Sequence, residues 1–140
     1  MIAYARPAMP RIGVISDTHG LVRPEALDAL RTIAPVVAVR GNNDRGRWAR
    51  ALAETEVVEQ SGRTFYLLHD VHELDVDPRA AGYDAVIAGH SHQPRVERRD
   101  GVLYLNPGSA GPRRFRLPIS VARIRIDARR LQAEIVTLDV

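Results

Sequence analysis

Four short apolar runs of this chain each end abruptly in a polar motif that carries histidine, aspartate or asparagine. In an open sheet of packed strands, functional groups gather beyond the carboxyl ends of the strands. The repetition therefore predicts buried strands whose polar ends converge on one site. The motifs are Ser16-Asp17-Thr18-His19, Gly41-Asn42-Asn43-Asp44, His69-Asp70 and Gly89-His90-Ser91-His92.

Carboxylate, amide and imidazole groups together indicate a site for a divalent metal ion, since oxygen and imidazole ligands suit Mn, Fe, Zn, Ni or Co. A single histidine after a strand is usually a surface loop residue, but four such motifs in one chain are rarely a coincidence. The chain has no cysteine and no lysine, because all 20 of its Lys+Arg residues are arginine. These absences exclude a thiolate nucleophile, a zinc–thiolate site, an iron–sulfur cluster, a Walker lysine and a Schiff base.

The length of 140 residues, of which 45% are hydrophobic, suits one domain with a modest core. We expect that domain to span residues 11–140, and residues 1–10 to be a disordered extension or the product of a start misassigned upstream of Met9. The sequence contains no signal-peptide core and no run of about 18 apolar residues, so we expect a cytoplasmic protein with no membrane partner. The formal charge of +3 is small and its arginines are dispersed, which favours a solvated surface.

Apolar periodicity and turn residues predict an α/β (α+β) chain of short strands and few helices. Residues 11–16 and 36–40 are predicted strands, and the helix between them, over residues 24–33, suits a parallel crossover. Shorter helices are expected over residues 47–53 and 78–82. Residues 85–88 form a further strand, and three predicted hairpins pair residues 57–60 with 64–68, 95–98 with 102–105, and 119–126 with 131–138.

The motifs, in this order, resemble those of the calcineurin-like metallophosphoesterase superfamily, and specifically its small YfcE-type phosphodiesterases. The loop Asn106-Pro107-Gly108-Ser109 completes the pattern, and the similarity covers residues 9–140. The resemblance implies a two-sheet β-sandwich flanked by helices (the αββα arrangement). It also implies divalent metal ions, with Mn expected and Fe, Zn, Ni, Co or Mg as alternatives. The ligands it implies are Asp17, His19 and His92 for one ion, and Asn42, His69 and His90 for the second.

One strand–helix unit of the family is missing here. Family members carry a strand that ends in Gly-Asp between the first motif and the Gly-Asn motif, and that Asp bridges the two ions. No Gly-Asp occurs between Gly20 and Gly41, so a unit of about 20 residues is absent. We therefore expect one or two ions per chain, with Asp44 and Asp70 as candidate substitutes for the bridge. The structural roles favoured for them are a helix N-cap for Asp44 and a turn for Asp70.

The implied function is that of a metal-dependent phosphoesterase, and above all a phosphodiesterase, in which a metal-activated hydroxide attacks phosphorus in line. The expected catalytic residues are Asn43, His69 and His90. Asn43 stands where many monoesterases of the superfamily have a histidine, and an amide cannot protonate an alkoxide, which favours diesters over alkyl monoesters. Arg113 and Arg114, with Asn43, are candidate ligands of the phosphate of a small phosphodiester or phosphomonoester substrate.

Two other functions stay open. The absent bridge also fits a catalytically impaired relative that binds metal and phosphate, and the arginine excess fits a nuclease-like nucleic-acid-binding protein. An edge left by the missing strand could be covered by a second subunit, so we expect a homo-oligomer. His72 could line the pocket and Trp48 could stack a base, although a solvent-facing loop and the core are the commoner places for such residues.

Overall fold

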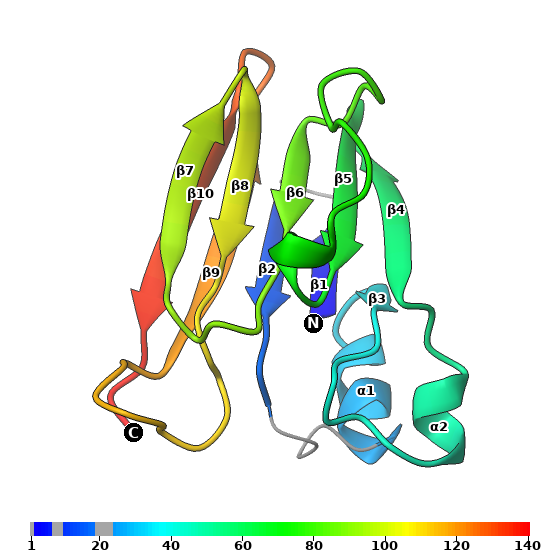
Figure 1. The fold of residues 1–140 in the computed structure, drawn as a ribbon, viewed down its shortest axis with the longest axis vertical. Coiled ribbons are helices and arrows are strands. Elements are labelled where there is room, and N and C mark those ends of the chain that lie inside the picture. The colour runs from blue at the N-terminus through cyan, green and yellow to red at the C-terminus, as the bar shows by residue number, and fades with distance from the viewer. Residues whose placement is uncertain (1, 7–9, 19–23) are drawn as a thin grey trace.

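The computed structural model describes residues 2–6, 10–18 and 24–140. The helices are α1 (Pro24–Arg31), α2 (Arg47–Arg50) and the short 3-10 helix η1 (Val71–Glu73). The strands are β1 (Ile2–Arg6), β2 (Arg11–Ile15), β3 (Val36–Ala38), β4 (Thr55–Gln60), β5 (Arg63–Leu68), β6 (Ala85–Ile87), β7 (Arg95–Arg99), β8 (Val102–Asn106), β9 (Ser120–Ile126) and β10 (Leu131–Thr137). They form two five-stranded sheets: sheet A in the order β10-β9-β2-β1-β3 and sheet B in the order β4-β5-β6-β8-β7 (Figure 1).

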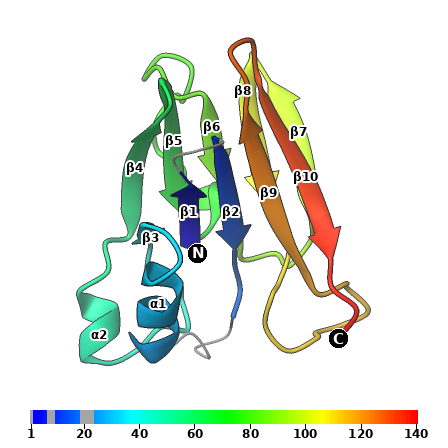
Figure 2. The same cartoon turned by 180° about the vertical axis from the view of Figure 1, so that it is seen from behind.

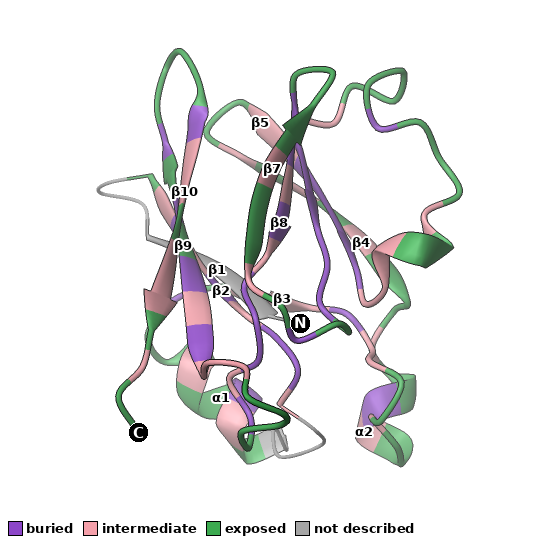
Figure 3. Ribbon diagram, turned by 60° about the vertical axis from the view of Figure 1, so that its left-hand side comes forward, coloured by how far each residue is buried: buried purple, intermediate pink, exposed green. Residues whose placement is uncertain are grey.

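The two sheets pack around one apolar core to which both contribute. Ile12 and Ile124 of sheet A share this core with Phe65, Leu67 and Leu103 of sheet B. Buried residues alternate along β9 because one face of that strand is exposed to solvent (Figure 3). All of β6 is buried, as expected for a central strand of a parallel set. The expected two-sheet sandwich of mixed α and β is confirmed. Its helices α1 and α2 are short and lie at one end, beside β3 (Figures 1 and 2).

The N-terminal residues correct one expectation, because residues 2–6 are part of the fold rather than a disordered extension. Strand β1 pairs antiparallel with β2 from Ile2↔Ile15 to Arg6↔Arg11, and on its other side with β3. The backbone groups of β2 and β3 that face β1 would otherwise lack strand partners, and this is the physical reason for the strand. The predicted crossover is thus present only in part: β2 and β3 are parallel, but β1 lies between them.

Most predicted elements are found close to their expected bounds. The three hairpins are confirmed as β4–β5, β7–β8 and β9–β10. Two helices differ: α2 has only four residues, and residues 78–82 form hydrogen-bonded turns, closed by Ala81 N–H to Asp77 O, instead of a helix. Among the described residues, no helix is long and apolar enough to cross a membrane.

Several strands end at the same edge of the sandwich. Strands β5, β6 and β8 are parallel, and Figure 1 shows their arrowheads and that of β2 pointing toward the end where α1 and α2 lie. The polar motifs that follow these strands are therefore delivered to one place, as the sequence pattern predicts.

Candidate functional site

A cleft of about 230 Å³ opens at this end and collects residues from all four motifs. Arg114 lines it, whereas its neighbour Arg113 is exposed and does not. His19, a predicted metal ligand, lies outside the described residues. The lining residues are Asp17, Thr18, Gly41, Asn42, Asn43, Asp44, His69, His90, Ser91, His92, Arg114 and Phe115.

Asp17 is the most deeply buried carboxylate of the cleft, with its side chain only 2% exposed. Its Oδ1 accepts the backbone N–H of His90 at 3.0 Å and lies 3.9 Å from Nε2 of His92. Its Oδ2 is buried without a hydrogen-bond partner among the residues that the structure describes. Such an oxygen is costly to leave unsatisfied, so this position favours a bound cation.

The backbone around Asp17 is held in an uncommon shape. Asp17, His90 and His92 all adopt left-handed conformations, with φ of 53°, 70° and 60°. Gly89 lets the two loops approach, because a Cβ there would lie 1.9 Å from Ser16 Oγ and 2.9 Å from Asp17 Oδ2. A side chain at position 89 would therefore displace the carboxylate that the cleft is built around.

His69 and His90 form the second feature of the cleft. Nε2 of His69 and Nδ1 of His90 are 3.2 Å apart, and the rings meet edge to face. Two nitrogen ligands of one ion, each about 2.0–2.1 Å from it, lie about 2.9–3.4 Å from one another. The separation thus suits two imidazoles that share an ion.

Burial lowers the pKa of His69 below its ordinary value, and the nearby His90 adds to this effect while Asp17 opposes it. The neutral imidazole is the form that can bind a metal. The lowered pKa therefore keeps His69 ready to act as a ligand at neutral pH.

This shift predicts the pH dependence of stability in the metal-free protein. Below pH about 6.5 His69 becomes protonated in the unfolded chain but stays neutral in the folded chain. The free energy of unfolding is therefore at its full value above that pH and falls as the pH drops toward the lowered pKa of the folded state. Denaturant unfolding at pH 7.5 and pH 5.5 should show a larger loss in the wild type than in His69→Gln. Equal losses in the two proteins would contradict the prediction.

Asp70 supports His90 from outside the cleft. Its Oδ2 lies 3.7 Å from Nε2 of His90, and its Oδ1 accepts from both the backbone N–H and the ring Nδ1 of His72. Burial favours the protonated carboxyl, but the hydrogen bonds from His72 outweigh it and hold the pKa of Asp70 below its usual range. His72 is exposed and binds Asp70, and it does not line the cleft.

Asp44 has a different role from the helix N-cap that was expected. Its Oδ2 accepts the backbone N–H of Gly41 at 2.8 Å, while the N-cap position of α2 is Gly46 and has no side-chain hydrogen bond. Asp44 thereby closes the loop that carries Asn42 and Asn43. Asp44 also lines the cleft, and among the described residues it and Asp17 are the two carboxylates that do so.

The loop after β8 contributes supports that are less apparent from sequence. Nδ2 of Asn106 donates to the carbonyl of Gly89 and to Ser91 Oγ, both at 3.0 Å, and Ser109 Oγ donates to the carbonyl of Asp17 at 2.8 Å. These bonds tie the first and fourth motifs together. The Asn-Pro-Gly-Ser motif signals the loop, but its spacing does not reveal which groups it holds.

The donor set of the cleft fits a divalent ion in its chemistry. Carboxylate and amide oxygens and imidazole nitrogens are all present, and the unsatisfied Asp17 Oδ2 faces no competing donor among the described residues. Within residues 2–6, 10–18 and 24–140, however, no three His, Cys, Asp or Glu side chains gather closely enough to hold an ion as they stand.

Comparison with known proteins identifies the family. Residues 20–129 match the family model of the calcineurin-like phosphoesterase superfamily domain. The chain belongs to this superfamily. A protein of Methanothermobacter thermautotrophicus named probable metallophosphoesterase is 32% identical, and the match covers 89% of this chain and 91% of that one. A phosphodiesterase of Methanocaldococcus jannaschii is 33% identical over 54% of this chain and 53% of its own length.

Solved structures share the fold of this chain. An archaeal phosphodiesterase matches 91% of this chain and 99% of its own with a TM-score of 0.73, and at 22% identity it shows the shared fold alone. Vps29 of Entamoeba histolytica, described in complex with Zn²⁺, matches 84% of this chain and 77% of its own with 27% identity and a TM-score of 0.62.

Membership in this phosphoesterase superfamily implies divalent metal ions. The alignment with the Methanothermobacter protein runs over 158 positions but includes only 89% of the 140 residues of this chain, so about 33 of its positions are gaps in this chain. A missing strand–helix unit of about 20 residues fits within these gaps.

Proposed function

We propose that the chain is a metal-dependent phosphodiesterase whose metal ligands are Asp17, His19, Asn42, His69, His90 and His92. The observation that carries this proposal is the pair of imidazole nitrogens at 3.2 Å beside a buried, unsatisfied carboxylate oxygen. A bound divalent ion, with Mn²⁺ expected, would polarise the phosphate and supply a water of lowered pKa as the nucleophile. His69 and His90 are catalytic in this proposal because they hold the reacting centre.

The protein's own groups would position the substrate. The amide of Asn43 and the guanidinium of Arg114 both line the cleft and can donate to phosphate oxygens. Neither is suited to protonate a leaving alkoxide, so esters with good leaving groups, and diesters above all, are the expected substrates.

Asp70 is proposed as a positioning residue and not as the substitute bridge. A ligand histidine commonly directs its second nitrogen to a carboxylate, and His90 directs Nε2 toward Asp70. Two +2 ions about 4 Å apart repel by roughly 17 kcal/mol at an effective dielectric of 20, before any anion offsets them. With one ligand carboxylate, Asp17, we infer one tight ion and a second that needs a bridging anion.

The test of function is hydrolysis of bis-p-nitrophenyl phosphate by the Mn²⁺-loaded protein. Release of p-nitrophenol should stop with a chelator and return when Mn²⁺ is restored. A rate that is the same with and without metal would contradict metal dependence. If p-nitrophenol release is no faster than in buffer without protein, the proposed enzymatic activity is contradicted.

A catalytically impaired relative is the second candidate, favoured by the missing Gly-Asp carboxylate. Calorimetry separates the two: that candidate would bind Mn²⁺ and inorganic phosphate without hydrolysing the diester. The same titration counts the ions. Asp44→Asn and Asp70→Asn form a matched pair, since loss of the second ion in Asp44→Asn alone would identify Asp44 as the bridge.

A further inference from the structure

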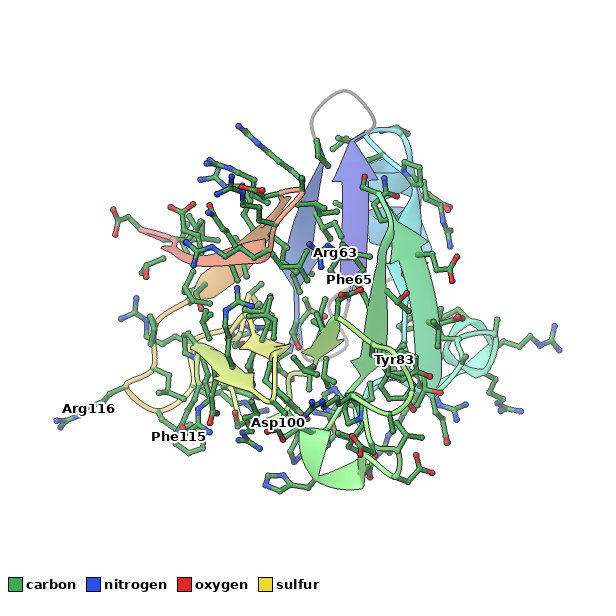
Figure 4. All side chains as sticks on the ribbon, turned by 90° about the horizontal axis from the view of Figure 1, so that it is seen from above. Arg63, Phe65, Tyr83, Asp100, Phe115 and Arg116 are labelled. Carbon is green, nitrogen blue, oxygen red and sulfur yellow. The ribbon has the colours of Figure 1, made fainter. Side chains whose placement is uncertain are left out.

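Phe115 is the most conspicuous apolar side chain at the rim of the cleft. It is 83% exposed and lines the cleft beside Arg114. The chain has two phenylalanines, and the other, Phe65, is 1% exposed within the core. Figure 4 shows this contrast, with Phe65 in the interior and Phe115 at the edge of the molecule. Packing of the folded chain therefore gives no reason for a large aromatic residue at position 115.

The backbone gives no reason either. Phe115 has φ of 55°, in the left-handed region that bulky residues rarely adopt. Glycine or asparagine would suit this conformation better. A residue that neither packs nor suits its own backbone is explained by what it binds.

Resting on the phosphodiesterase function proposed above, we propose that Phe115 is a stacking platform for a planar aromatic group on the substrate, such as an aryl or nucleobase-bearing arm of the diester. The cleft measures about 230 Å³, below the range of about 300–1,000 Å³ in which proteins enclose a whole small ligand. It can therefore take the phosphate while the organic arms lie at the rim. Phe115 occupies that rim.

The residue next to Phe115 supports an anionic ester as the ligand. Arg114 lines the same cleft and carries a planar cation suited to phosphate oxygens. An arginine for the phosphate beside an aromatic ring for the attached planar group is a common pairing in proteins that bind single nucleotides or strands.

A docked protein is the less suitable occupant. Protein partners cover contiguous apolar patches. Of the other exposed large hydrophobic residues within the described ranges, none lines this cleft; they are Ile33, Val57, Val76, Val96 and Val140.

Calorimetry with two small phosphonates tests the proposal without requiring turnover. The Mn²⁺-loaded wild type should bind phenylphosphonate about tenfold more tightly than methylphosphonate, the preference expected from one stacked ring. Phe115→Ala should lose this preference with methylphosphonate binding unchanged, whereas Phe115→Trp should keep it. Val96→Ala, which removes an exposed apolar side chain away from the cleft, is the control and should match the wild type.

A preference that survives in Phe115→Ala would overturn the stacking role. Failure to bind either phosphonate would overturn both this proposal and the phosphate site. Selective binding of phenylphosphonate by a protein that does not hydrolyse bis-p-nitrophenyl phosphate would overturn the phosphodiesterase activity alone.

Thermal unfolding gives a second readout. In Phe115→Gly, the Tm of the metal-free protein should stay the same or rise by up to about 3 °C, because glycine relieves the left-handed backbone at this position. A clear fall in Tm would show a packing role and contradict the proposal.

Discussion

Replacing His90 by alanine is expected to lower kcat/KM for bis-p-nitrophenyl phosphate on the order of 10³-fold, the scale seen when one stabilising group of a reacting centre is removed. The variant loses one of the two nitrogens that face each other at 3.2 Å and leaves His69 without its partner. His90 is exposed, so the core is unaffected and the loss should appear in activity before stability. Initial rates in saturating Mn²⁺ give the measurement.

His72→Ala is the matched control for that variant. His72 is also an exposed histidine and also contacts Asp70, but it does not line the cleft. It should keep the rate within about twofold, given the small coupling expected of exposed groups. Equal activity of the wild type and His90→Ala would remove His90 from the mechanism, and an equal loss in both variants would point to Asp70 instead.

Removal of residues 1–9 is expected to cost the protein roughly 5 kcal/mol or more, which is comparable to the whole stability of a small domain. Strand β1 is the only link in the sheet between β2 and β3 among the described strands, and it pairs with both. Its loss breaks several ladder hydrogen bonds at about 1 kcal/mol each and leaves the facing backbone groups of β2 and β3 without strand partners. Thermal unfolding followed by circular dichroism should show a greatly lowered or absent transition.

A single substitution makes the same point without shortening the chain. Ala3 is paired with Val14 on one side and Val37 on the other. Ala3→Pro removes a ladder donor in a central strand and should cost about 3 kcal/mol, whereas Ala3→Ser keeps the backbone donor and should cost less than 1 kcal/mol. A truncated chain and an Ala3→Pro variant that both unfold like the wild type would show that β1 does not contribute to the sheet.

Local signals in the sequence predicted the strands, the hairpins and the cleft, whereas the two-sheet sandwich was implied by the resemblance to the superfamily. Strand-forming runs followed by turn dipeptides such as Asp100-Gly101 define the hairpins, and motifs at strand ends must gather where parallel strands finish. Asp17, Asn42, His69, His90 and His92 were brought together in this way. Arg113 does not line the cleft, although its neighbour Arg114 does. In an irregular loop the sequence has no helical or strand periodicity from which the direction of each side chain could be predicted.

The parts that were not predicted depend on a long-range strand partner or on loop contacts that residue spacing does not specify. β1 has a weak signal of its own and becomes a strand through pairing with residues up to 38. Asp44 does not cap the helix as expected, because its side chain accepts the backbone N–H of Gly41 within the loop that precedes the helix. The exposure of Phe115 could be suspected only from its place among arginines, at Arg113-Arg114-Phe115-Arg116.

The left-handed residues at the centre of the cleft imply a conflict between activity and thermal robustness. Asp17, His90 and His92 each occupy a backbone region that costs a residue with a side chain about 1–2 kcal/mol. A library of random variants selected only for survival on heating should therefore collect glycine or asparagine at these three positions and lose the proposed metal ligands there as it gains stability. The first positions to change in such a library would then be those whose side chains are needed for activity and not for stability.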